Sequence, residues 1–417
     1  MIVYPVDTGF GHPAMPPEYA AAAQEDPFAR RCRRIEAYHP LYRSLIGQLT
    51  VASPALEDLA DSFPALLFAL ASGFGTPSAR AGVLDLVERG AGLREAAGLL
   101  GLAPWLRRLP PGAFTGPLPP FSQDSATAQR MASLVPTDPV PARLWLDGVV
   151  AGWRGCSEEF ALWIAGGIGR PSRLALLPFA QGNLRLLAAW GWHADRPDTL
   201  PHRLLRRAWT PAMGHRRALD EIAAWRQRID LALVLSARRG GAEAPAAGQA
   251  LGYEFHPLES AEDFVSEADI MDNCLDQFAD RLAMRFSRVY SIRRNGRSVA
   301  NVEIGTHDEE ASMPAIRQLR GVRNRRAPPE VWQATYAWLG AQAARPIPPE
   351  AARGDATAIR SEARRLWEPY LAAVEHRWPA AEFRALANGF MRGDLERAES
   401  VRRAAMLPRL RRASDAP

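Results

Sequence analysis

The sequence predicts a mainly α, multi-lobed protein with one α+β module, a helix packed on a three-stranded antiparallel meander. Apolar residues recur at helical spacing over most of the chain, whereas residues 288–319 alternate apolar with polar residues as strands do. Segments rich in Pro and Gly, at residues 109–120 and 238–248, separate the patterned stretches. The expected parts are a helical lobe over 1–115, a Trp-rich helical lobe over 121–239, the α+β module over 250–340 and a C-terminal helical segment over 350–417.

Positive charge is concentrated in one region of an otherwise ordinary composition. The hydrophobic fraction is 47%, and the 51 basic residues, all Arg, face 46 acidic residues for a net charge of +5. Residues 281–326 contain eleven Arg and four acidic residues, so their excess of seven is larger than that of the whole chain. Because a guanidinium group binds phosphate through several N–H groups, this clustering predicts a surface for nucleic acid or another polyanion.

Cysteine usage and the absence of apolar spans indicate the compartment. Cys32, Cys156 and Cys274 lie far apart and outside any CxxC or Cys/His cluster, which argues against a disulfide framework and a structural zinc site. The amino terminus has no basic segment followed by an apolar run, and the apolar stretch 64–71 is too short to span a bilayer. We therefore expect a cytoplasmic protein with no membrane partner, no metal and no cofactor.

Two features of the N-terminal lobe are weighed for nucleic-acid binding. The basic run Arg30–Arg34 lies on a predicted helix, where such runs are usually a solvated face. Residues 93–109 resemble a helix-turn-helix, with Ala97 as the small residue and Gly101 as the turn glycine. The Pro pair at 110–111 ends the second helix after about two turns, too early for a recognition helix. An ordinary helical hairpin is the favoured interpretation.

The module is predicted element by element. Ser260 followed by Asp263 resembles a capping box, and an apolar stripe then predicts one helix that continues to Leu282. The stripe consists of Phe264, Ala268, Met271, Leu275, Phe278 and Leu282. Three β-type runs follow, at residues 289–292, 299–304 and 315–319, and the Asn295-Gly296 pair between the first two favours a hairpin.

The residues along this module resemble the PcfJ-like domain of plasmids and other mobile elements, over about residues 255–340. A Cys on a helix, a Ser-containing strand, an Arg-rich turn, a strand that ends in Glu and the pattern Gln-x-x-Gly-x-x-Asn carry the resemblance. The matching residues are Cys274, Tyr290, Ser291, Arg293, Arg297, Glu303, Gln318, Gly321 and Asn324. Asn273 and Leu275 depart from the His and Val that flank the Cys in the family. The resemblance implies an accessory protein of a conjugative or integrated element.

The expected binding residues combine the arginines with polar groups of the meander. If the second and third strands pair, Glu303 and Gln318 lie on the same face and form a cleft with Arg293 or Arg297. A solvent-facing sheet with Asn324 holding a turn is the plainer interpretation, and it stays open. The full set of binding candidates is Arg293, Arg297, Glu303, Gln318, Arg320, Arg323, Asn324 and Arg325.

A second hypothesis is that the chain is an enzyme. Cys274, with His307 after one strand and a polar Gln318 or Asn324 near another, has the chain order of some Cys-dependent hydrolases or transferases. Cys274 is expected about three turns into its helix, away from the helix N-terminus that would lower its pKa. A small buried thiol that packs on the sheet is therefore favoured. A protein-binding scaffold is the third hypothesis.

Overall fold

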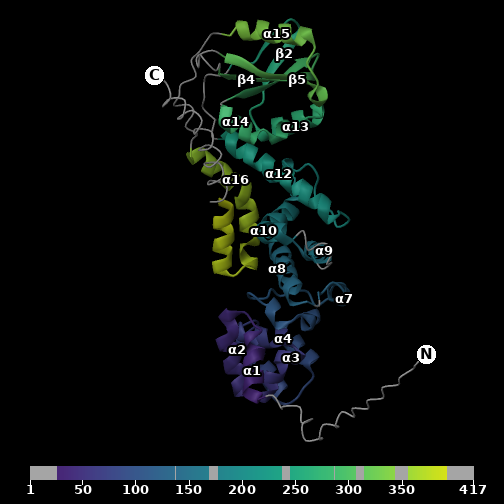
Figure 1. The fold of residues 1–417 in the computed structure, drawn as a ribbon, viewed down its shortest axis with the longest axis vertical. Coiled ribbons are helices and arrows are strands. Elements are labelled where there is room, and N and C mark those ends of the chain that lie inside the picture. Colours follow the sequence, from purple (N-terminus) through teal and green to yellow (C-terminus); the bar gives the residue numbers. More distant parts are fainter. Residues whose placement is uncertain are drawn as a thin grey trace, which may run out of the picture. The chain divides into compact units, whose positions relative to one another are not determined.

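The computed structural model describes residues 26–136, 138–168, 177–236, 245–285, 287–306, 314–342 and 356–391 (Figure 1). The chain divides into two compact units, residues 1–143 and 144–417. About 65% of the model is helical, and its strands form one antiparallel sheet. None of the helices within the described ranges is long and apolar enough to cross a membrane.

The first unit is a bundle of short helices, most of which begin with proline. Its α-helices are α1 (Pro27–Glu36), α2 (Pro40–Ala52), α3 (Pro54–Ser62), α4 (Pro64–Ala71), α5 (Pro77–Glu88), α6 (Leu93–Leu100) and α7 (Ser125–Ala132), with 3₁₀ turns η2 (Pro104–Arg108) and η3 (Pro111–Ala113). Proline suits the first helical position because its fixed φ matches the helix and its missing N–H would be unpaired there. Helix α4 is buried from Pro64 to Leu70 and forms the centre of this unit.

The structure describes both features of this unit that were weighed for nucleic-acid binding. The second element of the helix-turn-helix candidate is the five-residue 3₁₀ turn η2 instead of a recognition helix, although Gly101 does end α6 in the left-handed conformation with φ 75°. In the basic run of α1, Arg31 and Arg34 donate to the Glu57 carboxylate of α3 at 2.8 and 3.3 Å. These two arginines therefore join helices within the unit.

The second unit packs long helices around a core rich in tryptophan. They are α8 (Pro139–Gly155), which begins just before the unit boundary, α9 (Glu158–Ile168), α10 (Leu177–His193), α11 (Leu200–Arg203), α12 (His215–Ser236) and α16 (Ala356–Val374), followed by the turn η8 (Glu375–Arg377) and helical residues 380–391. The core includes Trp190, Trp225 and Trp367, each fully buried. The same core continues into the α+β module, where it includes Phe264 and Val289.

His193 is enclosed in this core and stays uncharged there. Its Nδ1 lies 3.0 Å from the hydroxyl of Thr199, and the rings of Trp192, Trp225 and Trp367 surround it. Burial lowers the pKa of His193 to about 3, with smaller contributions from His202 and Arg196. A charged imidazole would lose its hydration at this position, so the folded state excludes the proton.

We expect the stability of the second unit to fall in mild acid because of His193. The pKa of His193 in the folded protein lies below its ordinary value of about 6.5. Between pH 6.5 and about pH 3 the unfolded chain therefore binds more protons than the folded one. The free energy of unfolding falls as the pH decreases through this range. Between pH 7 and 5 this contribution amounts to about 2 kcal/mol. Urea denaturation of the wild type and of His193→Gln measures the difference between their free energies of unfolding at pH 7 and at pH 5. We expect this difference to be smaller at pH 5 by the same amount. A pH-independent difference would contradict the assignment.

The module's sheet has five strands, where three were expected. Its strands are β1 (Gly248–Ala250), β2 (Tyr253–Pro257), β3 (Arg288–Arg294), β4 (Arg297–Thr306) and β5 (Pro314–Gly321), all antiparallel and in chain order. Strands β3 to β5 cover the three segments that were predicted as strands, but they belong to the larger sheet, and the turn Asn295-Gly296 has φ values of 53° and 72°. The two additional strands form a hairpin around Leu251 and Gly252, which also have positive φ.

Both faces of the sheet are covered, and by different helices (Figure 1). The apolar face, with Phe255, Tyr290 and Val302, packs on α15 (Pro329–Gly340), whose Trp338 stacks on Phe255 at a ring distance of 4.4 Å. The polar face lies against α13 (Ala261–Met271), η5 (Leu275–Gln277) and α14 (Ala279–Arg285). The predicted helix therefore seals the polar face of the sheet, and a later helix seals the apolar one.

The helix expected to run without a break from residue 260 to 282 is in fact interrupted. The capping box of Ser260 and Asp263 is present, but α13 ends at Met271 and Asp272 adopts the left-handed conformation with φ 48°. Cys274 consequently lies in a turn and is exposed, so the expectation of a buried thiol inside a helix is wrong. The break turns residues 272–274 toward the end of the sheet.

A buried ion pair joins η5 to the helical core. Arg228 of α12 donates to Asp276 through Nε at 2.9 Å and Nη2 at 2.8 Å, and to the carbonyl of Leu204 at 3.1 Å. The Arg228 side chain is 1% exposed and that of Asp276 is 9% exposed. This pair fixes the turn that follows residues 272–274.

Candidate functional site

A polar cleft lies between the turn after α13 and the polar face of β4 and β5. It is small and is lined by Asn273, Leu275, Phe278, Val289, Asn301, Glu303, Gln318, Arg320 and Asn324. Leu275, Phe278 and Val289 form an apolar side, and the remaining residues bring amide, carboxylate and guanidinium groups. Polar groups that converge beside apolar walls are a usual feature of ligand-binding sites, although this cleft is smaller than most of them.

Strand pairing places the two central polar side chains next to each other. Glu303 of β4 lies opposite Gln318 of β5, and the register shifts immediately afterwards, so that Ile304 lies opposite Ile316. Such bulges often occur beside functional sites, where they redirect side chains. Asn301 and Arg320 form the next pair on the same face.

A second buried carboxylate, Glu267 of α13, organises the floor of this face. Its two oxygens accept hydrogen bonds from Asn301 Nδ2 at 2.7 Å and from the Ser298 hydroxyl at 3.0 Å. Asn273 Nδ2 in turn donates to Asn301 Oδ1 at 2.8 Å, while Asn273 Oδ1 accepts from the Leu275 backbone N–H at 3.1 Å. This chain of bonds fixes the cleft against α13 and leaves Glu267 fully paired.

Glu303 differs from Glu267 because its carboxylate has no hydrogen-bond donor. The residue is 3% exposed, and neither Oε1 nor Oε2 is hydrogen-bonded to a described residue. The Arg281 guanidinium is 3.8 Å from Oε2, and it donates at 2.6 Å to Gln318 Oε1 instead. Because arginine only donates, this bond fixes the oxygen of the Gln318 amide toward Arg281 and leaves its NH₂ group for another partner.

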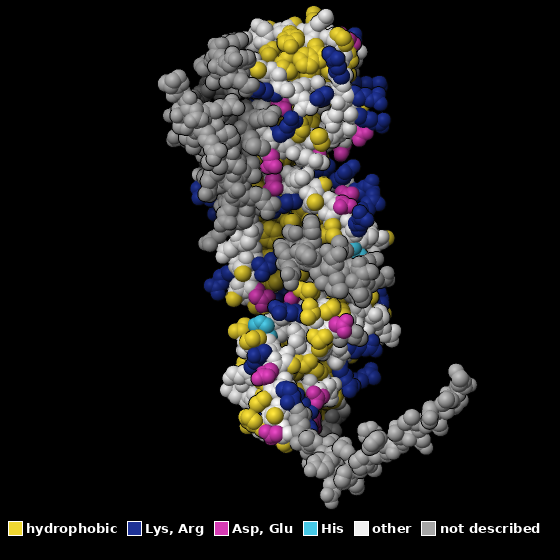
Figure 2. All heavy atoms as spheres, in the orientation of Figure 1, with side chains coloured by type: hydrophobic (Ala, Val, Ile, Leu, Met, Phe, Trp, Pro, Cys, Tyr) yellow, Lys and Arg dark blue, Asp and Glu magenta, His cyan; other side chains and the backbone are white. Residues whose placement is uncertain are grey.

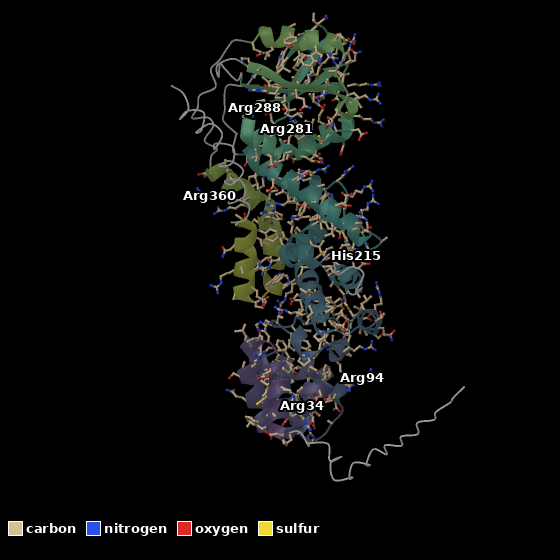
Figure 3. The ribbon with its side chains drawn as sticks, in the orientation of Figure 1. Arg34, Arg94, His215, Arg281, Arg288 and Arg360 are labelled. Carbon is tan, nitrogen blue, oxygen red and sulfur yellow. The ribbon has the colours of Figure 1, made fainter. Side chains whose placement is uncertain are left out.

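The arginines of the module fall into two groups along the strands. Arg281 of α14 and Arg288 at the start of β3 are labelled in Figure 3, at the α14 end of the module. The other group lies at the opposite end, which we call the hairpin end. There the turn after Arg294 is close to the loop after β5, because Gly321 at the end of β5 pairs with Ala300 near the start of β4. Figure 2 shows dark-blue side chains along this border of the module.

Several arginines at the hairpin end already have partners. Arg293 Nε donates to the Ser291 hydroxyl at 3.2 Å, and Arg294 lies over the Tyr253 ring at 5.3 Å. Arg323 forms an exposed ion pair with Asp272 at 2.9 Å. These three guanidinium groups are therefore at least partly engaged within the module.

Four exposed arginines remain, and we call them the arginine edge. They are Arg297, Arg320, Arg325 and Arg326. None has an ion pair with a residue in the described ranges. Arg320 and Arg326 form a backbone bridge, and Arg320 also lines the cleft, so the edge and the cleft are continuous.

No family model matches the chain, and neither a curated protein nor a solved structure similar to it was found. The resemblance to the PcfJ-like domain therefore stays a prediction based on the module's own residues. Three of those residues, Glu303, Gln318 and Asn324, line the cleft.

The residues of the enzyme hypothesis are only partly described. Cys274 is exposed beside the cleft, and the amide nitrogen of Asn324 is 3.8 Å from its sulfur. His307 lies outside the described residues. Within the described ranges, no three His, Cys, Asp or Glu side chains are placed to hold a metal ion.

Residues missing from the sequence-based set complete the site. Glu267, Asn273, Arg281 and Asn301 fix or line the cleft, yet none of them was among the binding candidates. For Glu267 there was a signal: it lies between Phe264 and Met271, at a position of α13 where the helical stripe calls for an apolar residue.

Proposed function

We propose that the α+β module binds single-stranded nucleic acid, with the phosphates held at the arginine edge. The observation that carries this proposal is the group of four exposed arginines, without an ion pair to a described residue, on β4, on β5 and in the segment after β5. By resemblance to the PcfJ-like domain, the chain would serve as an accessory protein of a mobile element.

The four arginines of the arginine edge lack carboxylate partners among the described residues. Like charges gathered at one place repel one another, and internal carboxylates would normally offset that cost. Elsewhere in the chain this occurs, as in the pairs that Arg31 and Arg34 form with Glu57. No carboxylate of the described residues forms an ion pair with the arginine edge, and a phosphate backbone would supply the compensating charge together with acceptors for each guanidinium fork.

A single strand suits this surface better than a duplex. Duplex readers usually insert a helix or a β-ribbon into a groove, and the one helix-turn-helix candidate ends in a short 3₁₀ turn. The arginine edge instead lies along strands and a loop at the surface of the module and borders a small polar cleft. Proteins that bind single strands combine such cationic tracks with pockets for individual bases.

A single substitution tests the arginine edge. Arg325→Ala should weaken binding of a labelled single-stranded oligonucleotide by about five-fold at ~0.1 M salt, the contribution of one lost phosphate contact through counterion release. Fluorescence anisotropy measures the dissociation constant. Arg94→Ala, which removes an exposed arginine of α6 in the first unit, is the matched control and should bind as the wild type does (Figure 3). Equal losses in both variants would contradict the proposal.

Cys-dependent chemistry is the second candidate, since Cys274 is exposed next to the cleft. A nucleophilic thiol needs a neighbouring base to take its proton. Among the described residues, Cys274 is in contact with the Asn324 amide nitrogen, which donates hydrogen bonds and accepts no proton. The arginine edge therefore supports nucleic-acid binding more directly than the thiol supports catalysis.

A further inference from the structure

Two neighbouring aromatic side chains lie at the surface of α15. Tyr336 is 61% exposed, and Trp332, one helical turn before it, is partly exposed. Their ring centroids are 5.9 Å apart with a tilt of 35°, so neither ring lies flat on the other. Trp338 of the same helix is arranged differently, because it is buried and stacks on Phe255. Exposed Tyr and Trp rings are enriched at binding surfaces, so the pair is a candidate contact for a ligand.

The surface around the pair has little charge. Glu330 is the only charged residue of α15, and at about 100° per residue it lies roughly opposite Trp332 around the helix axis. Figure 2 shows hydrophobic side chains gathered at the top of the module, where α15 lies, with dark-blue side chains beside them. The other exposed positions on this side of the helix are Pro329, Gln333, Ala337 and Gly340.

The chain connects this aromatic pair directly to the arginine edge. Arg325 and Arg326 are followed by the buried Ala327 and by Pro328, the N-cap residue of α15. From Arg326 to Trp332 the backbone therefore spans at most about 16 Å, three steps of extended chain and one helical turn. A few nucleotides of an extended single strand cover that distance, so one strand can contact both surfaces.

Base stacking is the interaction that this combination of residues suits. Every nucleobase has a flat π face, and proteins that bind single strands combine a cationic track for the backbone with aromatic rings for successive bases. Trp332 and Tyr336 are about 6 Å apart along the helix, close to the separation of neighbouring bases in an extended strand. We propose that these two rings stack on bases of the strand whose phosphates the arginine edge holds. This inference rests on the proposed function, because it assigns the base contacts of the same surface.

A nucleic-acid strand fits this surface better than an apolar protein partner does. A purely apolar partner would cover the two rings but would also bring uncompensated desolvation to the neighbouring Arg325 and Arg326. These arginines have no ion pair with a described residue. A single strand offers flat rings and phosphates together, at the spacing of one chain.

The first experiment removes an exposed ring. Tyr336→Ala should weaken binding of a labelled single-stranded oligonucleotide by about 5-fold or more, as expected for lost stacking on one base. Tyr336→Phe keeps the ring and should bind as the wild type does. Phe28→Ala, which removes a ring that is 70% exposed in the first unit, is the matched control. Wild-type affinity in Tyr336→Ala, the result expected of a surface for a protein partner, would overturn the inference.

The second experiment removes the bases and keeps the phosphates. A strand of equal length that consists of abasic nucleotides carries the same charge but has no ring to stack. Tyr336→Ala should bind this strand as the wild type does, which also reports that the variant is folded. Loss of the arginine edge should instead weaken binding of both strands. Equal losses of affinity for the two strands in Tyr336→Ala would contradict stacking.

Fluorescence reports contact at the second ring. Trp332 is partly exposed, whereas most of the chain's twelve tryptophans are buried. A base that stacks on Trp332 should quench a part of the intrinsic fluorescence that Trp332→Phe lacks. Since phenylalanine keeps a ring that can pack on the core of the module, Trp332→Phe should retain most of its affinity for the strand. Identical quenching in the wild type and in Trp332→Phe would show that no base reaches this ring.

The stacking assignment and the proposed function fail in different ways. If strand binding depends on Trp332 and Tyr336 but not on the arginine edge, the proposed function fails and the stacking assignment stands. If strand binding depends on the arginine edge alone, the proposed function stands and the stacking assignment fails. Failure of every strand to bind overturns both.

Discussion

Replacing Arg228 with alanine is expected to lower the free energy of unfolding by about 3–5 kcal/mol, because removal of one partner of a buried ion pair leaves the other charge uncompensated. Arg228 is 1% exposed, and two of its nitrogens contact the Asp276 carboxylate, which is 9% exposed. The substitution also leaves the Leu204 carbonyl without its donor. Urea denaturation followed by tryptophan fluorescence measures the loss, since most of the tryptophans lie in the second unit.

An exposed ion pair of the same module is the control for Arg228. Arg323 and Asp272 are 68% and 70% exposed, so Arg323→Ala should cost less than about 1 kcal/mol. Since Asp276 belongs to η5, which directly follows Asn273 and Cys274, Arg228→Ala should also loosen the cleft. A loss below 1 kcal/mol in Arg228→Ala would show that the pair does not hold this turn.

Removal of the whole arginine edge is expected to have the largest effect on binding. If each of its four guanidinium groups displaces counterions from one phosphate, alanine at all four positions should weaken single-strand binding by on the order of 10²–10³-fold at ~0.1 M salt. The matched control replaces four other exposed arginines with no partner among the described residues. These are Arg94, Arg130, Arg360 and Arg364.

Both tetra-alanine proteins have the same net charge, so a difference between them reports position. The control should bind within a few-fold of the wild type, because general electrostatic attraction to a distributed charge is weak and screened by salt. Similar losses in the two proteins would mean that the nucleic acid responds to overall charge, and the arginine edge would have no special role.

The meander could be predicted from sequence because its signals are local. Alternation in 299–304 and the Asn295-Gly296 turn specify a hairpin with little help from the rest of the chain, and β3 and β4 form as expected. The hairpin of β1 and β2 was missed, since its strands are only three and five residues long. The alternation of Tyr253 and Phe255 after Gly252 was the available signal.

The geometry of the site depends on tertiary contacts, which local sequence patterns do not reveal. The apolar stripe predicts one continuous helix, and a left-handed Asp272 breaks it because the following turn is fixed by Asn273 and the buried Asp276. Pairing of Glu303 with Gln318 followed from the predicted strands, but the burial of Glu303 did not. A polar strand face predicts exposure to solvent, and here a helix with its own buried carboxylate covers that face.

The distribution of arginine was foreseen only in part. Its density over residues 281–326 predicted a basic module, whereas the pairing of Arg281, Arg293 and Arg323 within that module had no sequence signal. Compared with the expected binding residues, the arginine edge adds Arg326. Arg323, which was expected to bind, instead pairs with Asp272.

The salt dependence of binding tests the central claim most directly. The logarithm of the association constant of a single-stranded oligonucleotide is measured against the logarithm of the salt concentration for the wild type and for the protein without the arginine edge. We expect the wild-type slope to be steeper than that of the variant by about three, as four phosphate contacts at about 0.7 each require. Equal slopes for the two proteins would contradict the claim that these arginines bind the phosphate backbone.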